Sequence, residues 1–188
     1  MTLRIGILGA ARIAPPAIIA PLRDIPGALV TAVGARDPER AAAFAKEHGI
    51  PHAVPREALV ERDDVDVVYV ALPTAHHGQA CIAALEAGKH VCCEKPFTLT
   101  PREAELVLAT AARVGKRCIE ATHYRYHPHM LRLLELVKDL GPIRSIEAEF
   151  ATPVRDTPEE FRRDPALGGG AMQDIGFYPV HLVRTLMG

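Results

Sequence analysis

The chain opens with Leu3-Arg4-Ile5-Gly6-Ile7-Leu8-Gly9-Ala10-Ala11-Arg12-Ile13-Ala14, and this stretch decides the fold. A short run rich in β-branched residues ends at a glycine, and helix-forming residues follow from Ala10 onward. Pro15-Pro16 fits the first turn of a helix far better than its interior, which favours a restart of the helix there. The stretch therefore predicts a strand, a tight turn and a helix, which together start a βαβ unit.

The turn has the form G-x-A-x-x-A, close to the dinucleotide-binding fingerprint G-x-G-x-x-G/A. Gly9 permits the tight turn and Ala14 permits close packing of the helix, whereas Ala11 replaces the glycine that lets the backbone approach a pyrophosphate. One extra methyl group still leaves room for a phosphate at the N-terminus of the helix. An ordinary turn of small residues explains the same pattern, so the turn alone does not decide between the two.

The rest of the first two thirds alternates between strands and helices. We expect strands at residues 29–35, 52–54, 65–71, 89–93 and 117–122, and helices at 37–48, 56–62, 74–87 and 100–114. With the opening strand this makes about six strands that alternate with helices, the pattern of a doubly wound parallel sheet. We therefore predict that residues 1–122 form an NAD(P)-binding Rossmann domain.

The alternation of strands and helices ends after residue 122. An amphipathic helix is expected at 128–140, a half-exposed strand at 143–152, a polar loop at 157–167, and a helical stretch from the Gly168-Gly169-Gly170 run to 186. One strand and two helices are too few to bury an amphipathic strand. Residues 123–188 are thus predicted to be an incomplete second domain, whose remaining part is missing or is supplied by another chain.

Composition narrows the class of protein. The chain has 188 residues, of which 48% are hydrophobic and 24% charged, enough to form a proper core. A formal net charge of −1 offers no excess of positive charge for nucleic acid or anionic lipid, and no apolar run is long enough to span a bilayer. The four cysteines show no metal-ligand spacing, so we expect no metal, free buried thiols and a cytoplasmic location.

Two arginines indicate which dinucleotide would bind. In NAD-binding folds an acidic residue beyond the second strand binds the ribose 2′-hydroxyl, but the residue here is Arg36. Asp37 precedes Pro38 as a helix N-cap, which engages its carboxylate. Arg36 and Arg40 would then bracket a 2′-phosphate, which favours NADP over NAD. Two solvated surface arginines are the alternative.

Catalytic residues are expected at Lys95 and on the helical stretch near the end of the chain. Lys95 follows a buried strand and precedes Pro96, and in open α/β sheets ligands bind beyond the carboxyl ends of the strands. Asp174, Tyr178 and His181 are spaced to share one helical face. Pro179 removes a helix hydrogen bond and favours a kink of this segment at Tyr178. A lysine, a tyrosine and a carboxylate at a nicotinamide can oxidise an alcohol. The alternatives are a solvated lysine and a helix face that only packs.

Several motifs together resemble one family. They are Gly6 to Ala14 (GILGAARIA), Glu94-Lys95-Pro96, Tyr124 to Pro128 (YRYHP), and Gly168 to Tyr178 (GGGAMQDIGFY). The set resembles the glucose-fructose oxidoreductase/inositol dehydrogenase/rhizopine-catabolism (Gfo/Idh/MocA) family, in the branch with dimeric dihydrodiol dehydrogenase and NADP-dependent xylose dehydrogenase.

The resemblance implies roles for individual residues. Lys95 matches the family's catalytic lysine, which commonly precedes a cis proline matching Pro96; Asp174 matches its acid, and Tyr178 falls where this branch carries tyrosine. Thr74 stands where many members have asparagine, and His77 keeps the expected spacing. For His76 and His77, which are lone histidines, the alternative is a purely structural role. The expected cofactor-binding residues are Gly9, Ala11, Arg12, Ile13, Arg36, Arg40, Leu72, Thr74, His77, Glu94 and Lys95.

The expected function is hydride transfer between a nicotinamide cofactor, NADP preferred over NAD, and a hydroxyl or carbonyl of a sugar, polyol or cyclic diol. The resemblance also implies that residues 123–188 are the incomplete start of an α+β open-sheet domain for substrate binding and dimerisation. Family members continue well past the residue that matches Gly188, and that further part supplies most of the open sheet, the floor of the substrate pocket and usually the dimer contact. The chain is therefore expected to be shorter than its relatives and, when complete, a homodimer through the missing sheet. The alternatives are a truncated fragment that binds the dinucleotide without turnover, and a structural interaction module that binds no cofactor.

Overall fold

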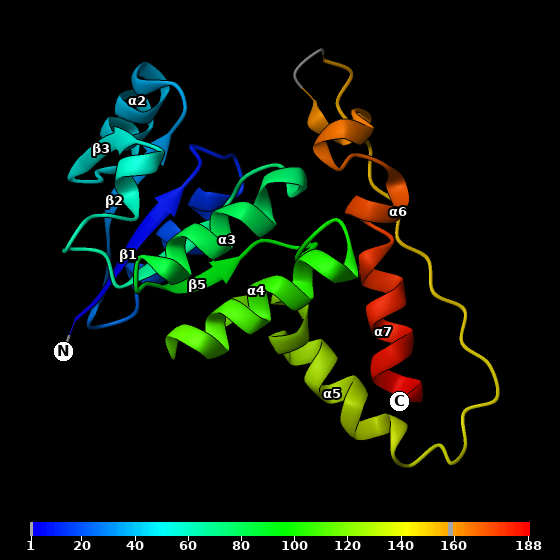
Figure 1. The fold of residues 1–188 in the computed structure, drawn as a ribbon. Helices are drawn as coiled ribbons and strands as arrows, with labels where there is room; N and C mark the ends of the chain where they lie inside the picture. Colours follow the sequence, from blue (N-terminus) through cyan, green and yellow to red (C-terminus); the bar gives the residue numbers. More distant parts are fainter. Residues whose placement is uncertain (1, 158–159) are drawn as a thin grey trace. The chain divides into compact units, whose positions relative to one another are not determined.

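The computed structural model describes residues 2–157 and 160–188 (Figure 1). Residues 158–159 of the expected polar loop therefore lie outside the described part. The chain divides into two compact units, Met1–Glu120 and Ala121–Gly188.

The first unit contains a six-stranded parallel sheet, as predicted. Its strands are β1 (Leu3–Leu8), β2 (Ala28–Ala35), β3 (His52–Pro55), β4 (Val67–Val70), β5 (His90–Cys93) and β6 (Cys118–Glu120). They lie in the order β3-β2-β1-β4-β5-β6, and every neighbouring pair is parallel. The order reverses between β1 and β4, which is the position where doubly wound sheets bind their ligands.

Helices connect these strands. They are a π-helix η1 (Pro15–Ile19) that continues as α1 (Ala20–Leu22), α2 (Pro38–His48), α3 (His77–Glu86) and α4 (Pro101–Val114), with 3₁₀ turns η2 (Glu57–Leu59) and η3 (Thr74–His76). Asp37 caps α2, and Thr100 and Glu103 form the predicted capping box of α4. The local signals for these two helix starts are therefore confirmed.

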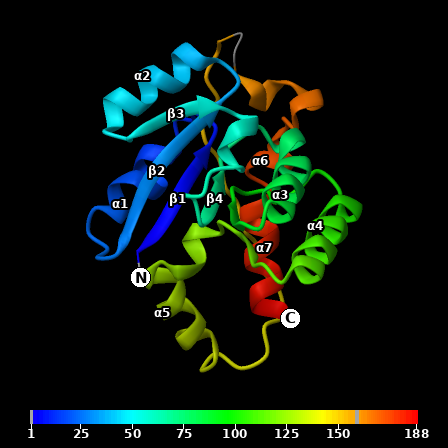
Figure 2. The same cartoon turned by 60° about the vertical axis from the view of Figure 1, so that its left-hand side comes forward.

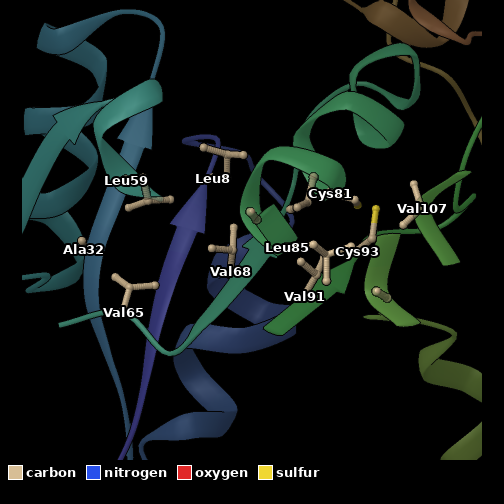
Figure 3. Close-up of a cluster of buried hydrophobic side chains, with 13 residues drawn as sticks. Leu8, Ala32, Leu59, Val65, Val68, Cys81, Leu85, Val91, Cys93 and Val107 are labelled. Carbon is tan, nitrogen blue, oxygen red and sulfur yellow. The ribbon is translucent and has the colours of Figure 1, made fainter. Parts of the chain in front are cut away.

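The core lies on both faces of the sheet. Alternate residues of a strand point to opposite faces. Val68 and Val70 of β4 therefore pack with residues of α3 and α4, whereas Tyr69 packs with the group that includes residues of α1 and α2. Figure 2 shows these helices around the sheet. Figure 3 shows the first of these clusters, in which Leu85 and Val91 meet. A sheet buried on both faces explains the nearly continuous apolar strands.

Two predictions for the first unit need correction. The residues from Ala10 to Ile13 are not helical, and the helix begins at Pro15, where the two prolines favoured a restart. Pro15 and Pro16 lack the N–H groups that a helix interior needs and are tolerated in its first turn. The helix expected at 56–62 is only the turn η2.

The second unit is made of short helices. They are η4 (His123–Tyr126), α5 (Pro128–Val137), η5 (Phe161–Arg163), η6 (Pro165–Leu167), α6 (Ala171–Asp174) and α7 (Phe177–Met187). The strand predicted at 143–152 is wrong, since those residues have no regular secondary structure. A strand needs a hydrogen-bonded neighbour, and the described part of this unit contains no other strand.

Candidate functional site

Three of the candidate segments follow three neighbouring strands. Gly9 comes directly after β1, Leu72 comes shortly after β4, and Glu94 and Lys95 follow β5. Because β1, β4 and β5 are adjacent and parallel, these segments meet at one edge of the sheet.

Gly9 is required by its backbone and by its neighbour. Its φ is +110°, and a Cβ at this position would lie 2.5 Å from the carbonyl oxygen of Ala71. Its N–H donates to the carbonyl oxygen of Gly34 at 2.7 Å. The turn after β1 is therefore held between the ends of β4 and β2, and only glycine fits there.

The residues beyond Gly9 form a turn before the helix. The N–H of Ala11 donates to the Gly9 carbonyl at 2.8 Å, and Ala14 is fully buried. Arg12 and Ile13 are exposed. The helix that follows begins at Pro15, with Ala14 at its N-cap. The exposed turn before it is the element that could contact a dinucleotide.

Arg40 lies beside this turn. Its Nη2 donates to the carbonyl oxygen of Ala10 at 2.8 Å. Asp37 accepts from the N–H groups of Glu39 and Arg40 at 3.0 and 3.3 Å, so its carboxylate is engaged as the α2 cap, as predicted. The position of the Arg40 cation beside the turn is therefore set by the helix that Asp37 begins.

More positive charge gathers near the ends of β2 and β3. Partial burial and the positive charges of Arg56 and Arg36 lower the pKa of His76. Arg36 is exposed directly after β2, and the N–H of Arg56 donates to the Ala35 carbonyl at 3.1 Å. This charge suits an anionic group such as a 2′-phosphate, so the residues present fit the NADP that the arginines predicted. Sequence reasoning missed Arg56, whose position after β3 was the only signal.

His77 joins two of the candidate segments. Its Nε2 lies 2.8 Å from the carbonyl oxygen of Leu72, and its Nδ1 lies 2.9 Å from that of Pro96. The residue is only 1% exposed. Its ring thus ties the segment after β4 to the segment after β5, which supports the structural alternative rather than direct contact with a cofactor. Thr74 is also buried and makes no side-chain cap.

The Glu94-Lys95-Pro96 segment is anchored by a buried hydrogen bond. The Lys95–Pro96 bond is cis, as the resemblance implied. Glu94 is buried and accepts a hydrogen bond from the phenol of Tyr69, and its other oxygen accepts from the Lys95 N–H at 3.3 Å. The half-buried Lys95 thus follows a residue whose side chain is fixed. Tyr69 was missed because it reads as one more apolar residue of a strand.

In the second unit, Asp174 and Tyr178 lie on different helices. Asp174 is the last residue of α6, and Tyr178 is the second residue of α7. The prediction that they share one helical face is therefore wrong. Pro179 lacks an N–H and fits the first turn of α7, so the chain breaks before it, near Gly176. Asp174 instead forms an ion pair with Arg162, at 2.7 Å from Nε to Oδ2.

Aromatic rings surround Tyr178 within this unit. The ring centroids of its neighbours lie 4.9 Å (Phe150), 5.5 Å (Phe177), 5.6 Å (Tyr124) and 5.8 Å (His123) away. The hydroxyl of Tyr124 lies 2.5 Å from Nδ1 of His181, and burial raises the pKa of Tyr124. Tyr178 is thus held by rings that restrict its orientation.

Three further properties of residues 2–157 and 160–188 concern metal-ligand groups, cysteines and apolar helices. No group of three or more His, Cys, Asp or Glu residues there could hold a metal ion. The four cysteines are free; Cys81 and Cys93 are buried, and burial raises the pKa of Cys92 to about 11. Within this described part, no helix combines the length and apolar character that crossing a membrane requires.

Comparison with known proteins agrees with this arrangement. Residues 3–122 match the family described as "Oxidoreductase family, NAD-binding Rossmann fold", and residues 130–188 match the GFO/IDH/MocA C-terminal domain. The chain is 39% identical to dTDP-3,4-didehydro-2,6-dideoxy-alpha-D-glucose 3-reductase of Streptomyces antibioticus over 99% of its own length and 57% of that protein. It is 38% identical to D-xylose 1-dehydrogenase (NADP(+)) 2 of Haloferax volcanii, over 97% of this chain and 57% of that one.

A solved structure is also similar over the whole chain. It is a 3-ketoreductase from Actinomadura kijaniata in complex with NADP and TDP-benzene, with a TM-score of 0.94 and 35% identity, over 100% of this chain and 58% of that one. The chain thus spans somewhat more than half the length of the relatives it matches. Two matched domains in the same order, and identities well above 30%, confirm the predicted resemblance: the chain belongs to the Gfo/Idh/MocA oxidoreductase family.

Proposed function

We propose that the protein containing this chain is an NADP-dependent oxidoreductase that transfers a hydride between the nicotinamide and a hydroxyl or carbonyl carbon of a sugar, polyol or cyclic diol. The observation that carries this proposal is the position of Lys95 in the segment that follows β5, at the edge of the sheet where β4 and β1 also end. Ligands of doubly wound sheets bind at that edge. The names of the reductase, the xylose dehydrogenase and the ketoreductase support the substrate class.

The cofactor would be held at the carboxyl edge of the first unit. The residues proposed to bind it are Gly9, Ala11, Arg12, Ile13, Leu72, Thr74, Glu94 and Lys95, with Arg36 and Arg40 at the 2′-phosphate. His77 is proposed to act indirectly, because its ring is bonded to Leu72 and Pro96. NADP, when bound, supplies or accepts the hydride.

The chain's own residues would handle the proton and the charge. We assign Tyr178 as the group that takes the proton from the substrate hydroxyl, or returns it in the reverse direction. Lys95 supplies positive charge that favours the phenolate form of Tyr178. Asp174 orients the substrate or the lysine through its carboxylate. In each direction one hydride and one proton leave the alcohol or join the carbonyl, so the reaction balances.

We also propose a cytoplasmic location and, for the complete protein, a homodimer. A cytoplasmic location fits the free thiols. A homodimer fits the branch that the motifs resemble.

The test is an activity screen on the protein containing this chain. Oxidation of D-xylose, D-glucose, myo-inositol and trans-cyclohexane-1,2-diol would be followed by NADPH absorbance with NADP⁺, and in parallel with NAD⁺. We expect turnover of at least one of these compounds. When each dinucleotide is supplied at low concentration, turnover should be faster with NADP⁺ than with NAD⁺. Tight binding of NADPH without turnover of any compound would reduce the protein to a dinucleotide-binding module, and the catalytic assignment would be wrong.

A further inference from the structure

One guanidinium group joins two carboxylates in the second unit. Arg162 donates from Nε to Oδ2 of Asp174 at 2.7 Å and from Nη1 to Oε1 of Glu160 at 2.8 Å. The side chain of Glu160 is 1% exposed and that of Asp174 is 13% exposed. Hydrogen bonds between charged groups are short and directional, and the planar guanidinium fixes both partners in orientation. Asp174 is therefore fixed by a residue twelve positions earlier in the chain.

The Gly168-Gly169-Gly170 run makes this contact possible. The N–H of Gly170 donates to the Arg162 carbonyl oxygen at 2.9 Å, and that of Gly169 donates to the Asp164 carbonyl at 2.8 Å. A Cβ on Gly169 would lie 2.6 Å from the Arg162 carbonyl oxygen, closer than real Cβ atoms come to a backbone. The glycines thus let the backbone lie directly on η5. This packing brings α6, which ends at Asp174, against Arg162.

The guanidinium of Arg162 bonds two carboxylates, those of Glu160 and Asp174. Partial burial disfavours the charge on Arg162, but its hydrogen bond to Glu160 and the charges of Asp174 and Glu160 outweigh that effect and raise its pKa. Arg162 is therefore a permanent cation. Glu160, almost without solvent, keeps the guanidinium at its place while Asp174 keeps partial access to solvent.

We propose that Arg162 is a positioning residue for the reaction proposed above: it holds the carboxylate of Asp174 in the orientation that catalysis needs, and Glu160 anchors Arg162. This inference rests on the proposed function and extends it to two residues that the sequence motifs did not single out. Arg162 acts through Asp174 and is not itself assigned a contact with substrate.

The chain offers a matched control in the same turn. Arg163 donates from Nη1 to Asp156 at 2.7 Å, but the Asp156 side chain is 91% exposed. Removing that exposed pair deletes an arginine from η5 without touching Asp174.

The experiment compares Arg162→Ala, Arg162→Lys and Arg163→Ala in the protein containing this chain, with NADP⁺ and the most active compound of the screen. For Arg162→Ala we expect kcat to fall about 10- to 100-fold, because a misdirected catalytic group loses that much, while the Kd for NADPH stays within about twofold. Arg162→Lys should recover part of kcat, since an ammonium group supplies the positive charge but not the planar set of N–H donors of a guanidinium. Arg163→Ala should leave kcat within about twofold of the parent protein.

The outcomes separate the two proposals. A parent protein that oxidises none of the compounds fails the proposed function, and the positioning role falls with it. An active parent whose Arg162→Ala variant keeps its kcat, or loses no more than Arg163→Ala, overturns the positioning role alone. If Arg162→Ala does not fold, a folded Arg162→Lys variant with unchanged kcat overturns it in the same way.

Discussion

The phenol of Tyr69 donates a hydrogen bond to the carboxylate of Glu94 inside the first unit. Tyr69 is 2% exposed and Glu94 is 8% exposed. Burial, together with the charge of Glu94, raises the pKa of Tyr69 well above its ordinary value, so the phenol stays protonated and the carboxylate accepts. A strand in the middle of the sheet thus supports the residue that precedes Lys95.

Replacing Tyr69 by Phe should destabilise the first unit by about 1–3 kcal/mol, because the Glu94 carboxylate then loses a buried donor. Urea denaturation measures the change. Tyr126→Phe is the matched control, since Tyr126 is 74% exposed and its hydroxyl should be worth less than about 0.5 kcal/mol. Equal effects of the two variants would show that the Tyr69–Glu94 hydrogen bond contributes no more to stability than an exposed hydroxyl does.

Two glycines with positive φ should respond differently to alanine. Gly49 has φ +70° and no atom within 4 Å of the position that a Cβ would take, so Gly49→Ala should cost only the strain of a left-handed residue, about 1–2 kcal/mol. Gly9→Ala adds a clash with the Ala71 carbonyl at 2.5 Å and should cost about 1–3 kcal/mol more. Thermal denaturation of both variants gives the comparison. A Gly9→Ala chain as stable as Gly49→Ala would mean that the turn relaxes away from β4.

The first unit should lose stability in acid through Asp66. Arg4 bonds both oxygens of Asp66, and this hydrogen bonding lowers the pKa of the carboxyl from 3.8 to about 2. The pKa is depressed in the folded state, so the stabilisation is present above about pH 4 and is lost as the pH falls toward 2. In the Asp66→Asn variant this part of the pH dependence should disappear, as measured by urea denaturation between pH 2 and 6. A parent and variant with parallel profiles would contradict the prediction.

Removing Arg36 or Arg40 should weaken NADPH binding about tenfold or more each, because a hydrogen bond to a charged group is worth about 1.5–3 kcal/mol. NADH, which has no 2′-phosphate, should bind about equally to the parent and to both variants. Fluorescence titration of each protein with each dinucleotide measures the dissociation constants. Arg23→Ala, a change of an arginine at the end of α1, is the control. If NADH and NADPH weaken together, the arginines support the fold and not the phosphate.

Lys95→Met should lower kcat about 10²- to 10⁴-fold while NADPH still binds, because the lysine is proposed to supply the charge that favours the phenolate form of Tyr178, the group that takes the proton. The control is Lys46→Met, at an exposed lysine of α2. Tyr178→Phe should lose a similar factor, and the double variant should lose little more than either single one, since groups that serve one step are not additive. Multiplicative losses would assign the two residues to separate steps.

Much of the fold followed from local signals. The alternation of apolar strands and helices predicted the six-stranded sheet, and the Asp37 cap and the Thr100–Glu103 box placed two helix starts. These signals act between residues close in sequence, so the sequence contains them directly. The predictions that failed needed distant partners or placed the break caused by a proline at the wrong residue. The strand at 143–152 has no neighbour in the described part of its unit, and the helix through residue 178 is broken ahead of Pro179.

The sequence by itself determined the family, the doubly wound sheet and the position of Lys95 at its carboxyl edge. Only the tertiary structure decided which side chains support the proposed site. Arg40 reaches Ala10 across thirty residues, Tyr69 reaches Glu94 across twenty-five, and Arg162 reaches Asp174 across twelve. The physical reason is that such contacts depend on how strands and turns pack, and no periodicity or cap in the chain records that packing.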